Sequence, residues 1–161
     1  MSEFYYNYAS IILPLHIISA VIWIGAMIGY IASTYPSIKQ IPNEKLMIRT
    51  SLRTLRRLMN LILVVSVVLV ISGVIIAIGA SYADKDPLLA TIINTKEALW
   101  IFMFFNTIFS FYKILEAKQS CLASDSGAAR DNVRLVSHYL IVINIFLGLI
   151  ATYFGMMLRS T

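Results

Sequence analysis

The chain has 161 residues, of which 59% are hydrophobic and 13% charged, and its mean hydropathy is +0.80. Soluble domains are about half apolar and about a quarter charged, so this composition argues against a soluble protein and favours a membrane protein. The net charge of +5 does not indicate nucleic acid binding, because the basic residues alternate with long apolar segments, and we expect no nucleic acid partner.

Four apolar segments are long enough to cross a bilayer. A spanning helix needs about 20 mainly apolar residues, and the chain offers such segments at about 9–34, 59–80, 97–115 and 134–158. We therefore predict an all-α integral membrane protein, in which residues 1–161 form a single domain, a four-helix transmembrane bundle in contact with the lipid bilayer.

The basic residues predict the orientation. Ten of the 13 Lys and Arg residues lie between spans 1 and 2 or between spans 3 and 4, and the other three are Lys85, Lys96 and Arg159. An excess of Lys and Arg marks cytoplasmic loops. We expect the N- and C-termini and the 81–96 loop outside, in a multi-pass protein of the cell (inner) membrane.

The first span divides into three faces when its residues are placed at 100° intervals. A polar and aromatic stripe is expected to face inward: His16, Ser19, Ala20, Trp23, Met27 and Tyr30. A β-branched stripe is expected to face lipid: Ile17, Val21, Ile24, Ile28 and Ile31. Gly25 and Gly29 form a small-xxx-small pair on the third face, where another helix could approach closely.

The other spans also carry one distinctive face each. Span 2 has small or slim residues, namely Ser66, Val70, Gly73, Ala77 and Ala80. Span 3 has an inward stripe of Lys96, Trp100, Met103, Thr107 and Ser110, with Asn106 at its edge. For span 4 we predict an inward face of His138, Val142, Ile145, Leu149, Thr152 and Met156.

Three ionisable side chains lie within the spans, and such residues are candidates for function. They are His16, Lys96 and His138. Each also has a structural interpretation. His16 could be hydrogen-bonded to a neighbouring helix, Lys96 could extend to the membrane surface from a helix end, and His138 could lie among the headgroups.

Two histidines in a membrane bundle suggest haem b, whose iron takes neutral imidazole as an axial ligand. At 1.5 Å rise per residue, His16 lies about 9 Å to the outer side of the midplane and His138 about 12 Å to the inner side. One iron cannot bind both. Lys96 and Met156 share the level of His16, and Gly73 and Ala77 leave space there.

The sequence therefore predicts one haem b site, with iron bound by His16. Trp23 lies on the same stripe, and Lys96 or Met156 is the candidate second ligand, unless that position stays open. His138 could serve a second haem at the inner level.

Three segments resemble a known family. His16, Trp23 and Gly25 in span 1, RRLMNLILVVSVVLVISGVIIA (56–77) with its basic Arg-Arg-Leu start, and NTKEALWIFMFFNTIF (94–109) with Lys96 at its head are similar to the HemJ-type membrane protoporphyrinogen IX oxidases. The first segment is equally similar to the CopD-type copper-resistance proteins. The HemJ resemblance implies His16 as a haem b ligand and Lys96 as second ligand or catalytic proton-transfer group.

The resemblance implies a redox protein that oxidises protoporphyrinogen IX and passes electrons to quinone or to a respiratory-chain partner. Its Arg- and His-containing run after span 1 is absent here, where the chain reads AMIGYIASTYPSIKQIP, so haem binding carries over better than oxidase activity. Two alternatives stay open. One is copper handling through Met and His ligands, and the other is a small accessory subunit, or a homo-oligomer, that docks through its apolar faces.

Overall fold

The computed structural model describes residues 2–79 and 87–160, and nearly all of them are helical, with no strand among them. The prediction of an all-α fold is confirmed. Each of four long rods is one helix or a continuous series of helical elements: α1 (Ser2–Gly29), η1 (Tyr30–Thr34) and α2 (Tyr35–Lys39); α3 (Glu44–Gly79); α5 (Pro87–Leu122); and α6 (Ser126–Leu135), η2 (Val136–Leu140) and α7 (Ile141–Ser160).

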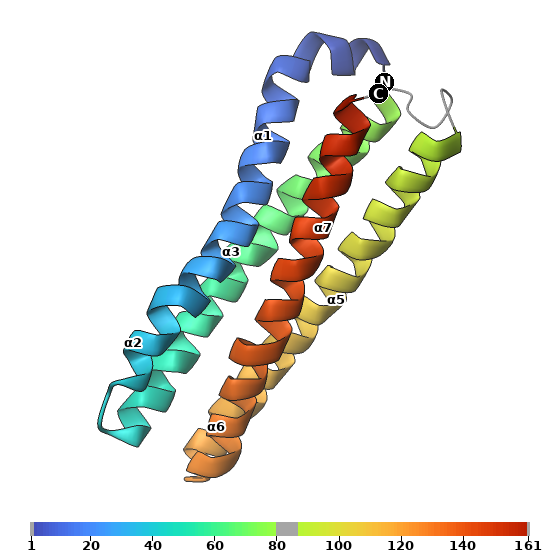
Figure 1. Cartoon of the computed structure of the whole chain (residues 1–161). Coiled ribbons are helices and arrows are strands. Elements are labelled where there is room, and N and C mark those ends of the chain that lie inside the picture. The colour runs from blue at the N-terminus through green and yellow to red at the C-terminus, as the bar shows by residue number, and fades with distance from the viewer. Residues whose placement is uncertain (1, 80–86, 161) are drawn as a thin grey trace.

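The rods form an antiparallel bundle in which both termini lie at the same end (Figure 1). α1 packs on α3 and α7, α5 packs on the same two helices, and α3 also contacts α6 of the fourth rod. The described residues include four helices long and apolar enough to cross a membrane: Tyr5–Lys39, Glu44–Gly79, Pro87–Leu122 and Ser126–Met157. The chain is thus a multi-pass membrane protein, with helices longer than the predicted spans. Its orientation remains a prediction.

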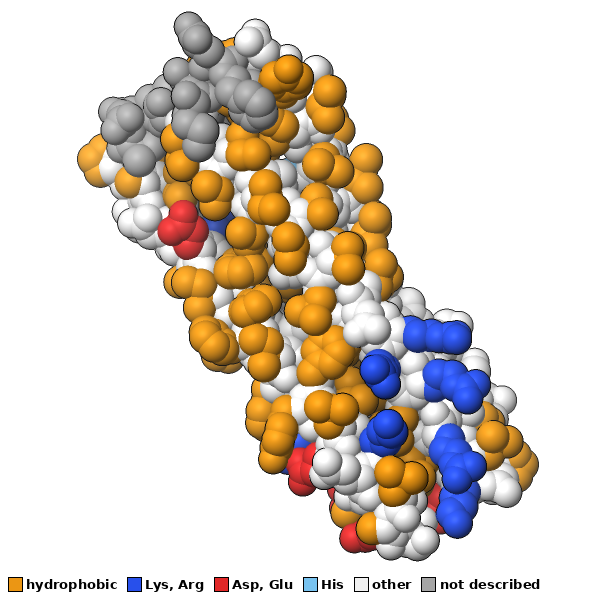
Figure 2. Space-filling model, turned by 180° about the vertical axis from the view of Figure 1, so that it is seen from behind, with side chains coloured by type: hydrophobic (Ala, Val, Ile, Leu, Met, Phe, Trp, Pro, Cys, Tyr) orange, Lys and Arg blue, Asp and Glu red, His pale blue; other side chains and the backbone are white. Residues whose placement is uncertain are grey.

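The surface is that of a membrane bundle. Hydrophobic side chains cover the middle of the face in Figure 2, and Lys and Arg side chains gather at the end remote from the termini. Large apolar residues such as Val64 and Phe105 are about two-thirds exposed on the isolated chain. Lipid covers such surface in a membrane, so its exposure here is what the spanning interpretation requires.

The predicted inward stripes of spans 1 and 3 are confirmed. On the first rod Ser19, Met27 and Tyr30 are buried, and on α5 Met103 and Thr107 are buried. The proposed lipid face of span 1 holds at Ile17, Val21 and Ile28, which are exposed. Ile24 is an exception, because it packs against α7.

The predicted face of span 4 is wrong by one residue. The buried positions are Ser137, Ile141, Asn144 and Gly148. Asn144 donates from Nδ2 to Thr107 Oγ1 at 3.1 Å, and its Oδ1 accepts from Asn106 Nδ2 at 2.8 Å. Gly148 lets Ile24 approach, since a Cβ on this glycine would lie 3.0 Å from Ile24 Cγ1.

The burial of small and polar residues on span 4 has a physical reason. Lipid is as apolar as leucine, so helices in a membrane meet through small and hydrogen-bonding residues, and large apolar side chains turn outward.

The glycine pair of span 1 makes no close contact within the described chain. No atom lies within 4 Å of a Cβ built on Gly25 or Gly29. The expected close approach of another helix therefore does not involve α3, α5 or α7, and this face of α1 is open.

Candidate functional site

His16 lies just beyond a proline on the first helix. Pro14 lies inside α1, where it has no N–H to donate to the carbonyl of Ser10 and its ring crowds that carbonyl, which bends a helix. Figure 1 shows α1 bent near its N-terminus. His16 follows two residues later and is half-buried against α3.

The imidazole of His16 is held by a serine of α3. His16 Nδ1 lies 2.8 Å from Ser72 Oγ, and the same hydroxyl donates to the carbonyl of Val68 at 2.6 Å. A hydroxyl has one proton, so the ring nitrogen must be the donor in the first bond. In a neutral ring, a proton on Nδ1 leaves the lone pair on Nε2.

Glycines on two helices make room at this level. A Cβ on Gly73 would lie 3.2 Å from His16 Cε1, and a Cβ on Gly155 would lie 3.3 Å from Lys96 Nζ. The ring of His16 therefore rests on the backbone of α3, and the ammonium of Lys96 rests on the backbone of α7. Small side chains permit both approaches.

Lys96 is at the same depth as His16. Ile24 of α1 and Met103 of α5 both lie beside Gly148, so these two residues are at one level of the bundle. At 1.5 Å rise per residue, His16 lies about 12 Å from Ile24 along α1, and Lys96 lies about 10 Å from Met103 along α5. The ammonium forms no ion pair or hydrogen bond within residues 2–79 and 87–160, so a half-buried cation lies at the level of the histidine without a counter-ion among these residues.

Three buried polar atoms lack a partner in the described part of the chain. They are Trp23 Nε1, Ser66 Oγ and Trp100 Nε1. Trp23 is only 1% exposed. Trp23 follows His16 by two helical turns, and Trp100 follows Lys96 by one, so both indoles lie on the inward stripes below the histidine. Unpaired buried donors are costly and call for an explanation.

His138 lies at the other end of the bundle. It is exposed, and its ring meets the edge of Tyr35 with centroids 5.1 Å apart. Tyr35 follows His16 by 19 residues along one continuous rod, which corresponds to about 28 Å. The prediction that the two histidines cannot share an iron is therefore consistent with the structure, whereas the inward placement of His138 is wrong.

Met156 does not face the interior. It is 66% exposed, so the expectation that its sulfur lies on the inward face beside His16 is wrong. The shift by one residue along α7 explains the error, because Gly155 takes the inward position. Ala80 lies outside the described residues, and Ala77 is half-buried.

Sequence reasoning missed two residues of this site, Ser72 and Gly155. A serine in a membrane helix often bonds its own preceding turn, as Ser72 also does, so its type alone does not show which helix it faces. Gly155 was missed because the predicted inward face of span 4 is displaced by one residue. A face predicted from the small residues of this span would have included Gly155.

No group of three or more His, Cys, Asp or Glu side chains in the described chain is arranged to hold a metal ion. Taken together, the fold and this site define a membrane-spanning four-helix bundle whose interior holds a histidine bonded to a serine, a half-buried lysine and two indole donors without a partner among the described residues. No protein-family model, curated protein or solved structure matches the chain.

Proposed function

We propose that this chain is a haem b-binding membrane redox protein in which His16 Nε2 is the axial ligand. The observation that carries the proposal is the bond from His16 Nδ1 to Ser72 Oγ. A histidine that binds a metal commonly donates its other N–H to a fixed acceptor, which sets the tautomer and orients the ring.

The donor set favours haem over a bare metal ion. A structural or catalytic zinc site takes three or four ligands from the protein, and copper sites likewise combine several imidazole or sulfur ligands. The described chain has no such cluster of His, Cys, Asp or Glu. Haem iron brings its own four porphyrin nitrogens, so one histidine is sufficient.

Haem would supply reversible one-electron chemistry at this level of the membrane. The residues around it would set its binding and potential. Lys96 offers either a second ligand, as the neutral amine, or a cation to pair with a propionate. Trp23 and Trp100 carry indole N–H donors that remain unpaired. Gly73 and Gly155 keep side-chain bulk away from His16 and Lys96.

Binding would require the helices to part. Neither of the two surface grooves found between the helices is lined by His16 or Lys96, so the proposal places haem in a space that opens when haem enters. The resemblance to the HemJ-type enzymes adds protoporphyrinogen IX as the proposed substrate, with Lys96 moving a proton and electrons leaving to quinone or to a respiratory-chain partner.

The test is the optical spectrum of the purified protein. We expect a reduced-minus-oxidised b-type spectrum, or uptake of added hemin with a Soret band, that is lost in His16→Ala. His138→Ala is the matched control and should keep the band, because the ring of His138 contacts Tyr35, which lies about 28 Å from His16 along the first rod. A colourless protein that takes up no hemin would refute haem binding, and loss of the band in His138→Ala alone would refute the site.

A further inference from the structure

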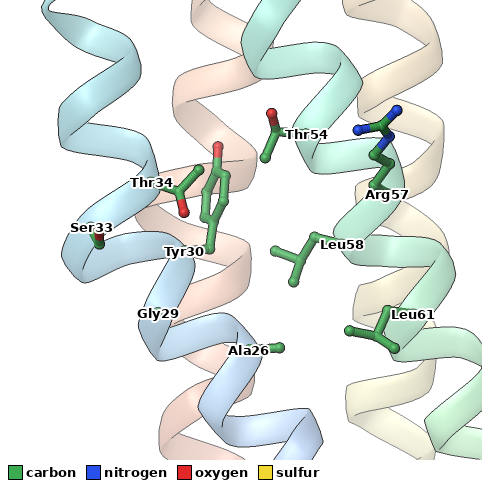
Figure 3. Close-up of a pocket in the computed structure, with 9 residues that line it drawn as sticks. All are labelled: Ala26, Gly29, Tyr30, Ser33, Thr34, Thr54, Arg57, Leu58 and Leu61. Carbon is green, nitrogen blue, oxygen red and sulfur yellow. The ribbon is translucent and has the colours of Figure 1, made fainter.

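A second hollow lies far from His16, between the first rod and α3 near the basic end of the bundle (Figure 3). Its volume is about 540 Å³, within the range of about 300–1,000 Å³ typical of small-ligand sites. Ala26 and Leu58 point toward each other across it in Figure 3. Nothing in the proposed haem site uses this groove.

One end of the groove is polar. Arg57, Thr54, Ser33 and Thr34 line it there. Arg57 is exposed and forms no ion pair or hydrogen bond within the described ranges, and the hydroxyls of Ser33 and Thr34 are also unused. Thr54 Oγ1 donates its proton to the carbonyl of Thr50 at 2.9 Å. The guanidinium of Arg57 is therefore the phosphate-binding group at this end, because arginine pairs readily with phosphate.

The other end of the groove is apolar. Ala26, Leu58 and Leu61 line it, and Gly29 adds no side chain. Ala26 precedes Ser33 by seven residues, so the change from apolar to polar takes about 10 Å along the helix axis. The polar end lies toward the basic end of the bundle, and the apolar end toward its middle. The groove thus matches the change in polarity from headgroup to acyl chain.

We propose that this groove binds one anionic phospholipid, with its phosphate on Arg57 and an acyl chain along Ala26 and Leu61. Basic pockets between membrane helices are known to bind anionic headgroups. Arg56, the neighbour of Arg57 on α3, is exposed and adds attraction for such a lipid. A second copy of the chain fits less well, because its helix would bury Arg57 without a counter-ion.

The occupant is a lipid rather than free phosphate because most of the lining surface is apolar. The proposal is independent of His16, so failure of one does not affect the other. Titration of the delipidated protein with dioleoylphosphatidylglycerol, followed by native mass spectrometry, tests it. Dioleoylphosphatidylcholine and inorganic phosphate are the comparison ligands.

We expect one phosphatidylglycerol to bind more tightly than phosphatidylcholine, with no measurable binding of phosphate alone. Arg57→Gln should weaken binding about fivefold, from about 1 kcal/mol per basic residue at an anionic surface, and Arg57→Lys should restore most of it. Ala26→Leu should weaken it by filling the groove. The matched controls are Arg53→Gln, on the same helix outside the groove, and Gly25→Leu, on the open face of α1 outside the groove.

Three results would overturn the proposal. Equal losses in Arg53→Gln and Arg57→Gln would mean general attraction to the basic end. Tight binding of inorganic phosphate would mean a phosphate site without a lipid. A dimer that Ala26→Leu dissociates, with lipid binding unchanged, would mean that a second copy occupies the face. If Ala26→Leu fails to fold, Arg57→Gln and Arg57→Lys still decide the outcome.

Discussion

Ser72→Ala provides the sharpest test of how His16 is held. The substitution removes the only side-chain acceptor of His16 Nδ1, at 2.8 Å, and changes little else, because alanine fits the space of serine. Loss of such a second partner typically lowers metal affinity about 10- to 100-fold. We therefore expect the Kd for hemin to rise at least about tenfold in Ser72→Ala, and the midpoint potential of any bound haem to shift.

Ser66→Ala is the matched control. Ser66 lies on the same helix and is 1% exposed, but its hydroxyl has no partner among the described residues. Removing an unpaired buried hydroxyl is neutral or stabilising, so this variant should keep the affinity for hemin. In thermal unfolding, Ser72→Ala should lose about 1 kcal/mol, the usual size of a hydrogen bond between membrane helices, and Ser66→Ala should lose nothing.

The measurement is a hemin titration followed at the Soret band, with a redox titration of the loaded protein. A merely structural role for Ser72 would lower thermal stability and leave the potential unchanged. Equal hemin affinities in Ser72→Ala, Ser66→Ala and the parent protein would refute the assignment of His16 Nδ1 as a donor that orients the ligand.

Two further predictions concern the interior. Gly73→Val places branched carbons where a single Cβ already lies 3.2 Å from His16 Cε1, so we expect the ring to be displaced and hemin binding to be lost, whereas Val74→Leu, at an exposed position of α3, should retain it in the same titration. Asn144→Ala removes one of the two acceptors that Asn106 Nδ2 bonds at 2.8 Å, the other being the carbonyl of Leu140, and should cost about 1–2 kcal/mol in thermal unfolding; an unchanged melting temperature would refute the view that this contact joins α5 to α7.

Most of the fold could be predicted from the sequence, because the length of an apolar segment suffices to identify a spanning helix. The inward faces of spans 1 and 3 were also predictable. Trp23, Tyr30, Asn106 and Thr107 are amphipathic or polar, and a bilayer core offers them no hydrogen bonds, so they turn toward other helices. On these two helices the polar stripe and the buried stripe coincide.

Span 4 could not be predicted in this way because its polar residues lie on more than one face. His138 and Asn144 are separated by about 240° around the helix at 100° per residue, and only one of them can face inward. His138 lies near the helix end and can reach water, whereas Asn144 lies at mid-span, where it needs a partner. The depth of each residue in the membrane therefore decides which of the two faces inward. An inward face predicted from Asn144 would have included Gly148 and Gly155.

The contacts between helices also bear on how haem would enter the proposed site. In the middle of the bundle Asn106, Asn144 and Thr107 join α5 to α7, and at the basic end Tyr30 Oη and Ser137 Oγ, 3.1 Å apart, join η1 to η2. Near the termini the bond from His16 to Ser72 crosses between helices, while Lys96 makes no such bond among the described residues.

The bend that Pro14 introduces into α1 lies at this same end. Parting the helices there breaks the bond from His16 to Ser72. A haem that enters near the termini would separate the bundle there and leave the two lower sets of hydrogen bonds intact.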